Sequence, residues 1–114
     1  AFYRWLFFTA SPVEMATTAK AFGWAVPEGK SGMAGFGKYS RTIATLEKAL
    51  QDKPYVCGDQ FTAADVYVGA TLNWGMMFGS IEKQPLFEDY VARMKARPAA
   101  IRADQINTNK MKAV

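Results

Sequence analysis

The sequence predicts an all-α fold, a bundle of five to six helices, and three observations support that prediction. The chain has 114 residues, of which 50% are apolar, a size and composition typical of one globular domain. Apolar residues recur at helical spacing in several segments, whereas no segment with turn signals at strand spacing alternates in the two-residue period of a strand. Prolines, glycines and capping residues divide the chain into segments of helix length.

The first helix is expected at the start of the chain, where seven of the first eight residues are apolar. Such side chains cover nearly the whole circumference of a helix, which predicts that it is buried or covered by a partner. Because an aromatic helix begins so abruptly, we expect a piece cut from a longer chain. Ser11-Pro12-Val13-Glu14 then has the pattern of an N-cap, a first-turn proline and a capping-box glutamate. It predicts a second short helix, or a kinked continuation of the first, to about Phe22.

A loop and an amphipathic helix are expected next. Residues 23–37 contain five glycines and a proline, a density typical of a loop. Gly29-Lys30-Ser31 resembles the end of a P-loop, but Trp24 occupies the position of that motif's first glycine, so phosphate binding is not predicted. A helix should follow, because four apolar residues then share one helical face: Tyr39, Ile43, Leu46 and Leu50.

The strongest local signal is Phe61-Thr62-Ala63-Ala64-Asp65-Val66. Thr62 is placed to cap a helix, and Asp65 can bond back to the Thr62 amide, as the glutamate of a capping box does. Phe61 and Val66 are placed as a hydrophobic staple. The helix that starts here is apolar on all sides as far as Phe78, so we expect it at the centre of the bundle, where its glycines let neighbouring backbones approach closely.

The last elements are predicted from prolines and charges. Pro85 starts a helix that ends before Pro98, with acidic residues in its first turn and basic residues in its last. A short final helix is expected around residues 99–104. The domain should therefore span residues 1–105, and residues 106–114 should form a polar, basic tail.

Composition excludes several classes of function. The chain has no histidine, which excludes a Ser-His-Asp triad, a histidine general base and an HExxH metal motif. Its one cysteine, Cys57, excludes a disulfide scaffold and a cysteine-ligated zinc site, and fits a reducing, cytoplasmic compartment; we interpret it as a packing residue. The longest uncharged run, 16 residues, is too short to span a membrane. We therefore predict no metal site and no membrane partner.

The net charge of +4 is concentrated at the C-terminal end. Residues 92–114 hold six lysines and arginines against Asp104 alone, whereas the rest of the chain is nearly neutral. A nucleic-acid-binding protein would instead show a basic stripe with interleaved aromatic residues, or a recognisable motif. Nucleic acid is accordingly not an expected partner.

Two stretches resemble the C-terminal helical domain of the glutathione S-transferases. The first, Tyr55–Asp65, contains Gly-Asp-x-x-Thr-x-Ala-Asp, and the second, Pro85–Pro98, contains Tyr-Val-x-Arg-x-x-x-Arg-Pro. The opening Tyr-Arg-Trp-Leu-Phe-Phe is similar to the first helix of that domain in bacterial members. The resemblance extends from about Tyr3 to Ala103, and it implies the five-to-six-helix bundle of that domain.

The resemblance also implies what the chain lacks. Family members carry an N-terminal thioredoxin-like domain, absent here, which binds glutathione and supplies the Ser, Tyr or Cys that stabilises the thiolate. No catalytic residue and no cofactor are therefore assigned to this chain, and glutathione is expected as the co-substrate of a full-length parent. The matching Thr62–Asp65 pair is implied to be a folding site, and its capping should stabilise the helix by about 0.5–2 kcal/mol.

The family's C-terminal domain contributes the pocket for the electrophile and part of the dimer interface. The resemblance implies Tyr3 and Phe7 of the first helix, and Trp74 of the central helix, as substrate-binding residues; ordinary packing is the alternative. The implied function is conjugation of glutathione to hydrophobic electrophiles, a detoxification reaction, by a cytoplasmic homodimer, with this chain inactive alone. One alternative is a non-catalytic helical interaction module, like those appended to translation factors and synthetases. Another is a cleaved fragment without a function of its own.

Overall fold

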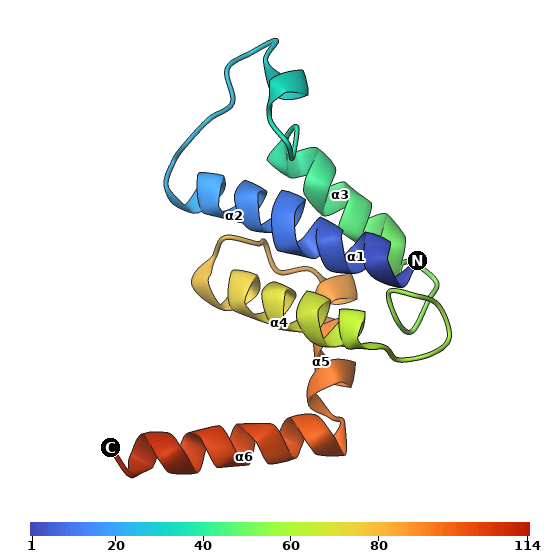
Figure 1. Cartoon of the computed structure of the whole chain (residues 1–114), viewed down its shortest axis with the longest axis vertical. Coiled ribbons are helices and arrows are strands. Elements are labelled where there is room, and N and C mark those ends of the chain that lie inside the picture. The colour runs from blue at the N-terminus through green and yellow to red at the C-terminus, as the bar shows by residue number, and fades with distance from the viewer.

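Helices account for the whole architecture of the computed structural model, which describes residues 1–114 (Figure 1). No strand is present, and the only β-type pairing is an isolated bridge between Tyr55 and Gly58. The predicted all-α fold with five to six helices is confirmed. The helices are α1 (Phe2–Phe8), α2 (Glu14–Ala21), α3 (Tyr39–Leu50), α4 (Ala63–Phe78), α5 (Pro85–Lys95) and α6 (Pro98–Lys112).

The helices α1 and α2 form one continuous rod. A π-helical segment, Thr9–Val13, joins them and contains Pro12. A proline has no amide hydrogen and its ring crowds the preceding turn of an α-helix, and the wider π-turn accommodates both. Of the two alternatives, the continuation of the first helix is therefore correct, with a π-helical segment where a kink was expected. The predicted N-cap is wrong, because Ser11 lies inside the rod and its hydroxyl reaches the Met15 sulfur at 3.7 Å instead of capping a helix.

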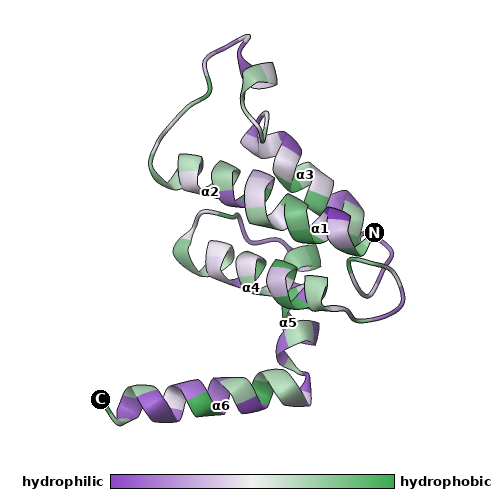
Figure 2. Cartoon of the chain, in the orientation of Figure 1, coloured by the Kyte–Doolittle hydropathy of each residue, from purple (hydrophilic) through white to green (hydrophobic).

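The hydrophobic core lies where the rod, α3, α4 and α5 meet. The rod contributes Trp5 and Val13, and α3 contributes the predicted stripe except for Tyr39, which is only partly buried. Figure 2 shows green, hydrophobic segments beside pale ones in α1 and α4, whereas α6 mixes green and purple along its length. The largest fully buried apolar side chains are Tyr90, Phe87, Leu46, Leu50, Leu72 and Ile81.

The helix α4 is buried on one side only. Ala64, Val68 and Leu72 are fully buried, whereas the opposite face of the helix, which carries Trp74 and Phe78, is largely exposed. The expectation that α4 lies at the centre of the bundle is thus wrong for that face, because the rod and α5 flank only part of the helix. An apolar composition on all sides has instead left an apolar surface open.

Two glycines of α4 allow side chains to approach its backbone. A Cβ atom at Gly69 would lie 2.9 Å from Met94 Cγ, and one at Gly75 would lie 2.5 Å from Ile81 Cδ1. It is therefore side chains, and not neighbouring backbones as expected, that use the space. Gly79 has a different role: its φ of 82° is left-handed, and it ends α4.

The start of α4 is organised around the fully buried carboxylate of Asp65. Asp65 Oδ2 accepts a hydrogen bond from the Thr62 amide at 2.9 Å, and Thr62 Oγ1 accepts one from the Ala64 amide at 3.3 Å, so the two residues form a capping box. Asp65 Oδ1 accepts two further bonds, from the Val56 amide at 2.8 Å and from the Tyr90 hydroxyl at 2.6 Å. One side chain therefore connects the loop before α4, the first turn of α4, and α5.

This arrangement shifts the pKa of Tyr90. Burial, followed by its hydrogen bond to Asp65 and the charge of that carboxylate, raises the pKa of Tyr90 well above its ordinary value, with the Arg93 cation opposing the rise. The neutral hydroxyl is the form that donates to Asp65. Tyr90 therefore keeps its proton and donates this hydrogen bond.

The two residues predicted as a hydrophobic staple lie on either side of the capping box. Phe61 packs edge-on against Tyr55, with ring centroids 6.0 Å apart, and the Arg97 guanidinium lies 3.8 Å above the Phe61 ring centroid. Val66 is about half exposed. The structure thus places Phe61 between two partners that its sequence position did not indicate.

The C-terminal helix is longer than the sequence predicts. Instead of a short helix around residues 99–104 and a polar tail at 106–114, α6 runs without interruption to Lys112. Pro98 starts it at a first-turn position, and no glycine or second proline follows to end it. The helix projects from the bundle and buries no residue, and the boundary predicted at residue 105 falls within it (Figure 1).

We predict that Asp65→Asn lowers the free energy of unfolding by about 3 kcal/mol. The amide supplies one acceptor oxygen where the carboxylate served three donors, and buried donors then lose their partners. Urea unfolding followed by circular dichroism measures the change. Asp59→Asn, in the exposed loop, is the matched control and should change stability by less than about 0.5 kcal/mol. Equal effects of the two variants would refute a structural role for the buried carboxylate.

Stability should also fall at alkaline pH because of Tyr90. Its pKa is raised on folding, so above about pH 10 the unfolded chain releases a proton that the folded chain keeps. The stabilisation is fully present below that pH and is lost above it, at about 1.4 kcal/mol per pH unit for this one group. Urea unfolding between about pH 9 and about pH 11 should show a shallower decline for Tyr90→Phe. The control, Tyr3→Phe, removes an exposed hydroxyl and should decline as the parent chain does.

Candidate functional site

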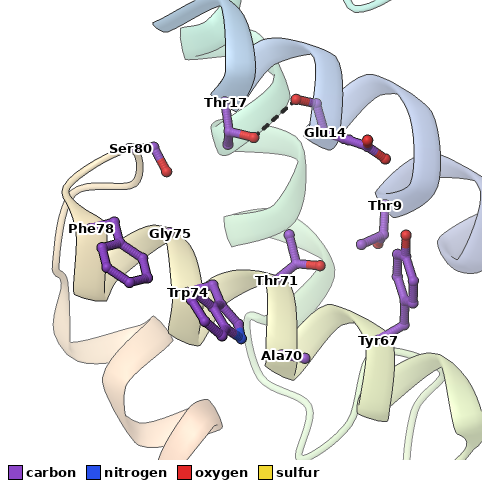
Figure 3. A pocket seen from close by; sticks show the side chains of 10 residues that line it. All are labelled: Thr9, Glu14, Thr17, Tyr67, Ala70, Thr71, Trp74, Gly75, Phe78 and Ser80. Atoms are coloured by element: carbon purple, nitrogen blue, oxygen red, sulfur yellow. Dashed lines mark hydrogen bonds between the residues drawn. The ribbon is translucent and has the colours of Figure 1, made fainter. Parts of the chain in front are cut away.

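A groove of about 460 Å³ lies between the rod and α4 (Figure 3). Its volume is within the range of small-molecule sites, and it combines aromatic surface with a few polar groups, which is the usual composition of such sites. Ten residues line it: Thr9, Glu14, Thr17, Tyr67, Ala70, Thr71, Trp74, Gly75, Phe78 and Ser80. A larger groove of about 600 Å³ between α4, α5 and α6 is lined mainly by alanines and aliphatic side chains and offers no aromatic ring.

The α4 wall of the groove is aromatic. Tyr67, Trp74 and Phe78 share one helical face, because they lie seven and then four residues apart. The rings of Trp74 and Phe78 are stacked, with centroids 5.0 Å apart and planes 23° apart. Both remain largely exposed, at 60% and 69%. The wall therefore presents a largely exposed pair of stacked rings as apolar surface for a ligand.

The rod wall of the groove is polar. Thr9 Oγ1 donates to the Trp5 carbonyl at 2.8 Å, and Thr17 Oγ1 donates to the Val13 carbonyl at 2.9 Å. Thr17 Oγ1 also donates to the Glu14 carbonyl at 3.0 Å, the bond drawn in Figure 3. Glu14 is exposed and is the only charged residue of the lining. The groove thus sets hydroxyls and one carboxylate opposite the aromatic wall.

Of the three substrate-binding residues predicted from the sequence, the structure places only Trp74 in this groove. Tyr3 and Phe7 stack on each other along the exposed side of α1, with centroids 6.3 Å apart, and neither lines the groove. They remain 70% and 66% exposed. Tyr3 and Phe7 therefore lie on the rod but outside the cavity that the rod forms with α4.

Sequence reasoning missed Tyr67, Phe78 and the polar residues of the rod. The first two could have been found, since Tyr67, Trp74 and Phe78 share one face of a helix already known to be apolar. The polar residues could not, because the π-helical segment changes the angular register between Thr9 and Glu14. Their convergence on α4 depends on that change.

Other chemistry-bearing features lie elsewhere. Cys57 is half-buried and its sulfur receives the Thr62 hydroxyl at 3.7 Å, beside the capping box and outside the groove. No group of three or more cysteine, aspartate or glutamate side chains is arranged to hold a metal ion. No helix has the length and apolar character required to cross a bilayer.

The fold is an all-helical domain, and the groove between the rod and α4 is an aromatic, ligand-sized site. A comparison with protein families matches residues 10–98 to the glutathione S-transferase C-terminal domain, over well more than half of the chain. The chain belongs to this family. No curated protein and no solved structure matches it. The matched range contains Asp65 and Trp74 but begins after the aromatic residues of α1.

Proposed function

We propose that the groove between the rod and α4 binds the hydrophobic electrophile of a glutathione transferase. The single observation that supports this is the exposed Trp74–Phe78 stack, which lines a cavity of about 460 Å³ in a domain of that family. A planar electrophile would bury its ring against the stack. The contribution of this chain is then positioning, which lowers the barrier by holding the acceptor carbon near the attacking sulfur.

In this proposal the sulfur comes from glutathione, held by a thioredoxin-like domain as co-substrate and not by this chain. With a chloroaryl acceptor, the thiolate sulfur forms a bond to the ring carbon, the carbon–chlorine bond breaks, chloride leaves and the thiol proton goes to solvent. Such thiolate chemistry requires a residue that lowers the thiol pKa. We assign that residue to the second domain, together with a detoxifying role and a cytoplasmic location.

The exposed apolar surface of the chain supports a partner. Tyr3 and Phe7 on α1 form a stacked pair that nothing in the chain covers, and such patches mark interaction sites. We propose that a second copy of the chain, in a homodimer, or the thioredoxin-like domain packs there. The bacterial-type assignment stays a prediction that rests on this same opening helix.

The exposed face of α1 also favours a second candidate function, a non-catalytic interaction module of the same fold. In that case Tyr3 and Phe7 would be an assembly surface and the groove would have no small ligand. The binding measurement below separates the two functions.

We predict that Trp74→Ala weakens binding of dinitrobenzene, an unreactive planar probe, by about tenfold. Loss of the stacked ring removes about 0.5–1.5 kcal/mol of aromatic interaction in addition to buried area. Equilibrium dialysis measures the dissociation constant. Trp24→Ala is the matched control, since Trp24 is 66% exposed but lies outside the groove. No saturable binding by the parent chain, or equal losses in both variants, would contradict the proposed site.

We also predict that the 114-residue chain alone does not conjugate glutathione to 1-chloro-2,4-dinitrobenzene above the uncatalysed rate. It lacks a group assigned to the thiolate, and positioning of the acceptor alone leaves the thiol at its ordinary reactivity. Absorbance of the thioether product gives the rate. Turnover that saturates with the acceptor would show that the chain itself activates the thiol. The assignment of that activation to a second domain would then be wrong.

A further inference from the structure

The charge of the groove has one sign. Glu14 is the only charged residue among the ten that line it, and no lysine or arginine lines it. The carboxylate of Glu14 is free for a ligand, since the hydrogen bond from Thr17 goes to the backbone carbonyl of Glu14 and not to its side chain. Figure 3 shows this carboxylate on the rod side of the groove. A ligand in the groove therefore meets a negative charge.

The hydroxyls of Thr9 and Thr17 on the rod wall offer no donor to a ligand. Their protons are committed to backbone carbonyls of the rod, and Thr9 is fully buried, so only the oxygen lone pairs of the partly buried Thr17 are available. The remaining hydroxyls, on Tyr67, Thr71 and Ser80, can rotate to donate or accept and favour neither. The polar side of the groove therefore offers more acceptors than donors.

The aromatic wall also favours a positively charged ligand. The face of an aromatic ring carries the negative part of its quadrupole, and tryptophan attracts a cation over its face more strongly than the other rings do. Trp74 and Phe78 each turn one face to the other in their stack, and both rings line the groove while largely exposed, so their outer faces are open to a cation.

The nearest cation that hydrogen bonds connect to the groove is already engaged. Lys20 donates to the Tyr39 hydroxyl at 3.2 Å and lies over the Tyr39 ring, and Tyr39 in turn donates to the Ser80 carbonyl at 2.8 Å. Lys20 itself lines a separate cavity between α2 and the loop that follows it. It does not supply a positive group to the groove lining.

We propose that this groove selects aromatic ligands that carry an ammonium group over the anionic equivalents, and that Glu14 is the residue that sets this preference. The proposal rests on the proposed function, because it names the substrate class of the same groove. The ring stacks on Trp74, and the ammonium group lies toward Glu14 and the lone pairs of Thr17. The net charge of the chain is +4, which by itself attracts anions, so a preference for cations must come from the groove.

Three probes that share one ring system test this: naphthylmethylammonium, naphthylmethanol and naphthoate. Their dissociation constants are measured by equilibrium dialysis at low ionic strength, where exposed charges are least screened. We expect the cation to bind about three- to tenfold more tightly than the anion, the size of effect that an exposed ion pair and a cation–π contact give together.

Glu14→Gln should bring this ratio close to one, while Glu28→Gln should leave it unchanged. Glu28 is exposed, lies in the loop after α2 and does not line the groove, so it controls for the loss of one negative charge. Circular dichroism checks that both variants fold. A ratio lost in the first variant and kept in the second supports the proposal.

The other outcomes contradict either the role of Glu14 alone or the whole proposed ligand site. If naphthylmethanol binds at Trp74 but charge makes no difference, or if the preference survives in Glu14→Gln, the selection by Glu14 is wrong and the proposed electrophile site stands. If none of the three probes binds, the groove is not a ligand site and both proposals fail.

Discussion

A carboxylate with no solvent exposure stands at the start of α4, and the position of that helix depends on it. Burying a charge is costly unless donors replace water, and Asp65 receives three, from the Val56 amide, the Thr62 amide and the Tyr90 hydroxyl. These donors come from the preceding loop, from α4 itself and from α5. Since the groove is formed by α4 against the rod, its aromatic wall is held in place by an interaction in the first turn of the same helix.

The sequence alone predicts those interactions that join residues close together in the chain. Thr62 and Asp65 are three residues apart, so the pattern of their reciprocal hydrogen bonds is visible without a structure. The other partners of Asp65 lie nine and 25 residues away, and no local rule connects them. The burial of α4 was predicted only in part for the same reason. Its apolar composition identified it as a helix of the core, but the number of its sides that are covered depends on which elements pack against it.

At Pro12 two local rules compete, and tertiary packing decides between them. Ser-Pro-x-Glu fits a helix start, yet the same residues form a π-turn inside a longer rod. Continuing the rod keeps Trp5, Thr9, Val13 and Ala16 buried along one side, whereas a break would interrupt that buried stripe. The π-turn also brings Glu14 and Thr17 to the groove. The insertion of Pro12 into the rod therefore accounts both for the irregular helix and for the polar wall of the groove.

Some residues of α4 belong both to the hydrophobic core and to the groove. This restricts the positions at which a substitution can alter the ligand preference without disturbing the core. Gly75 lines the groove while Ile81 packs against its backbone, so a side chain added there would displace the core. Thr9 and Ser80 are similarly constrained, the first by burial and the second by the bond from Tyr39. Glu14, Trp74 and Phe78 are exposed and free of such packing, and substitution of exposed residues away from special contacts costs little stability. The residues that choose the ligand are therefore those that the fold can exchange with least effect on the Asp65 network and the core.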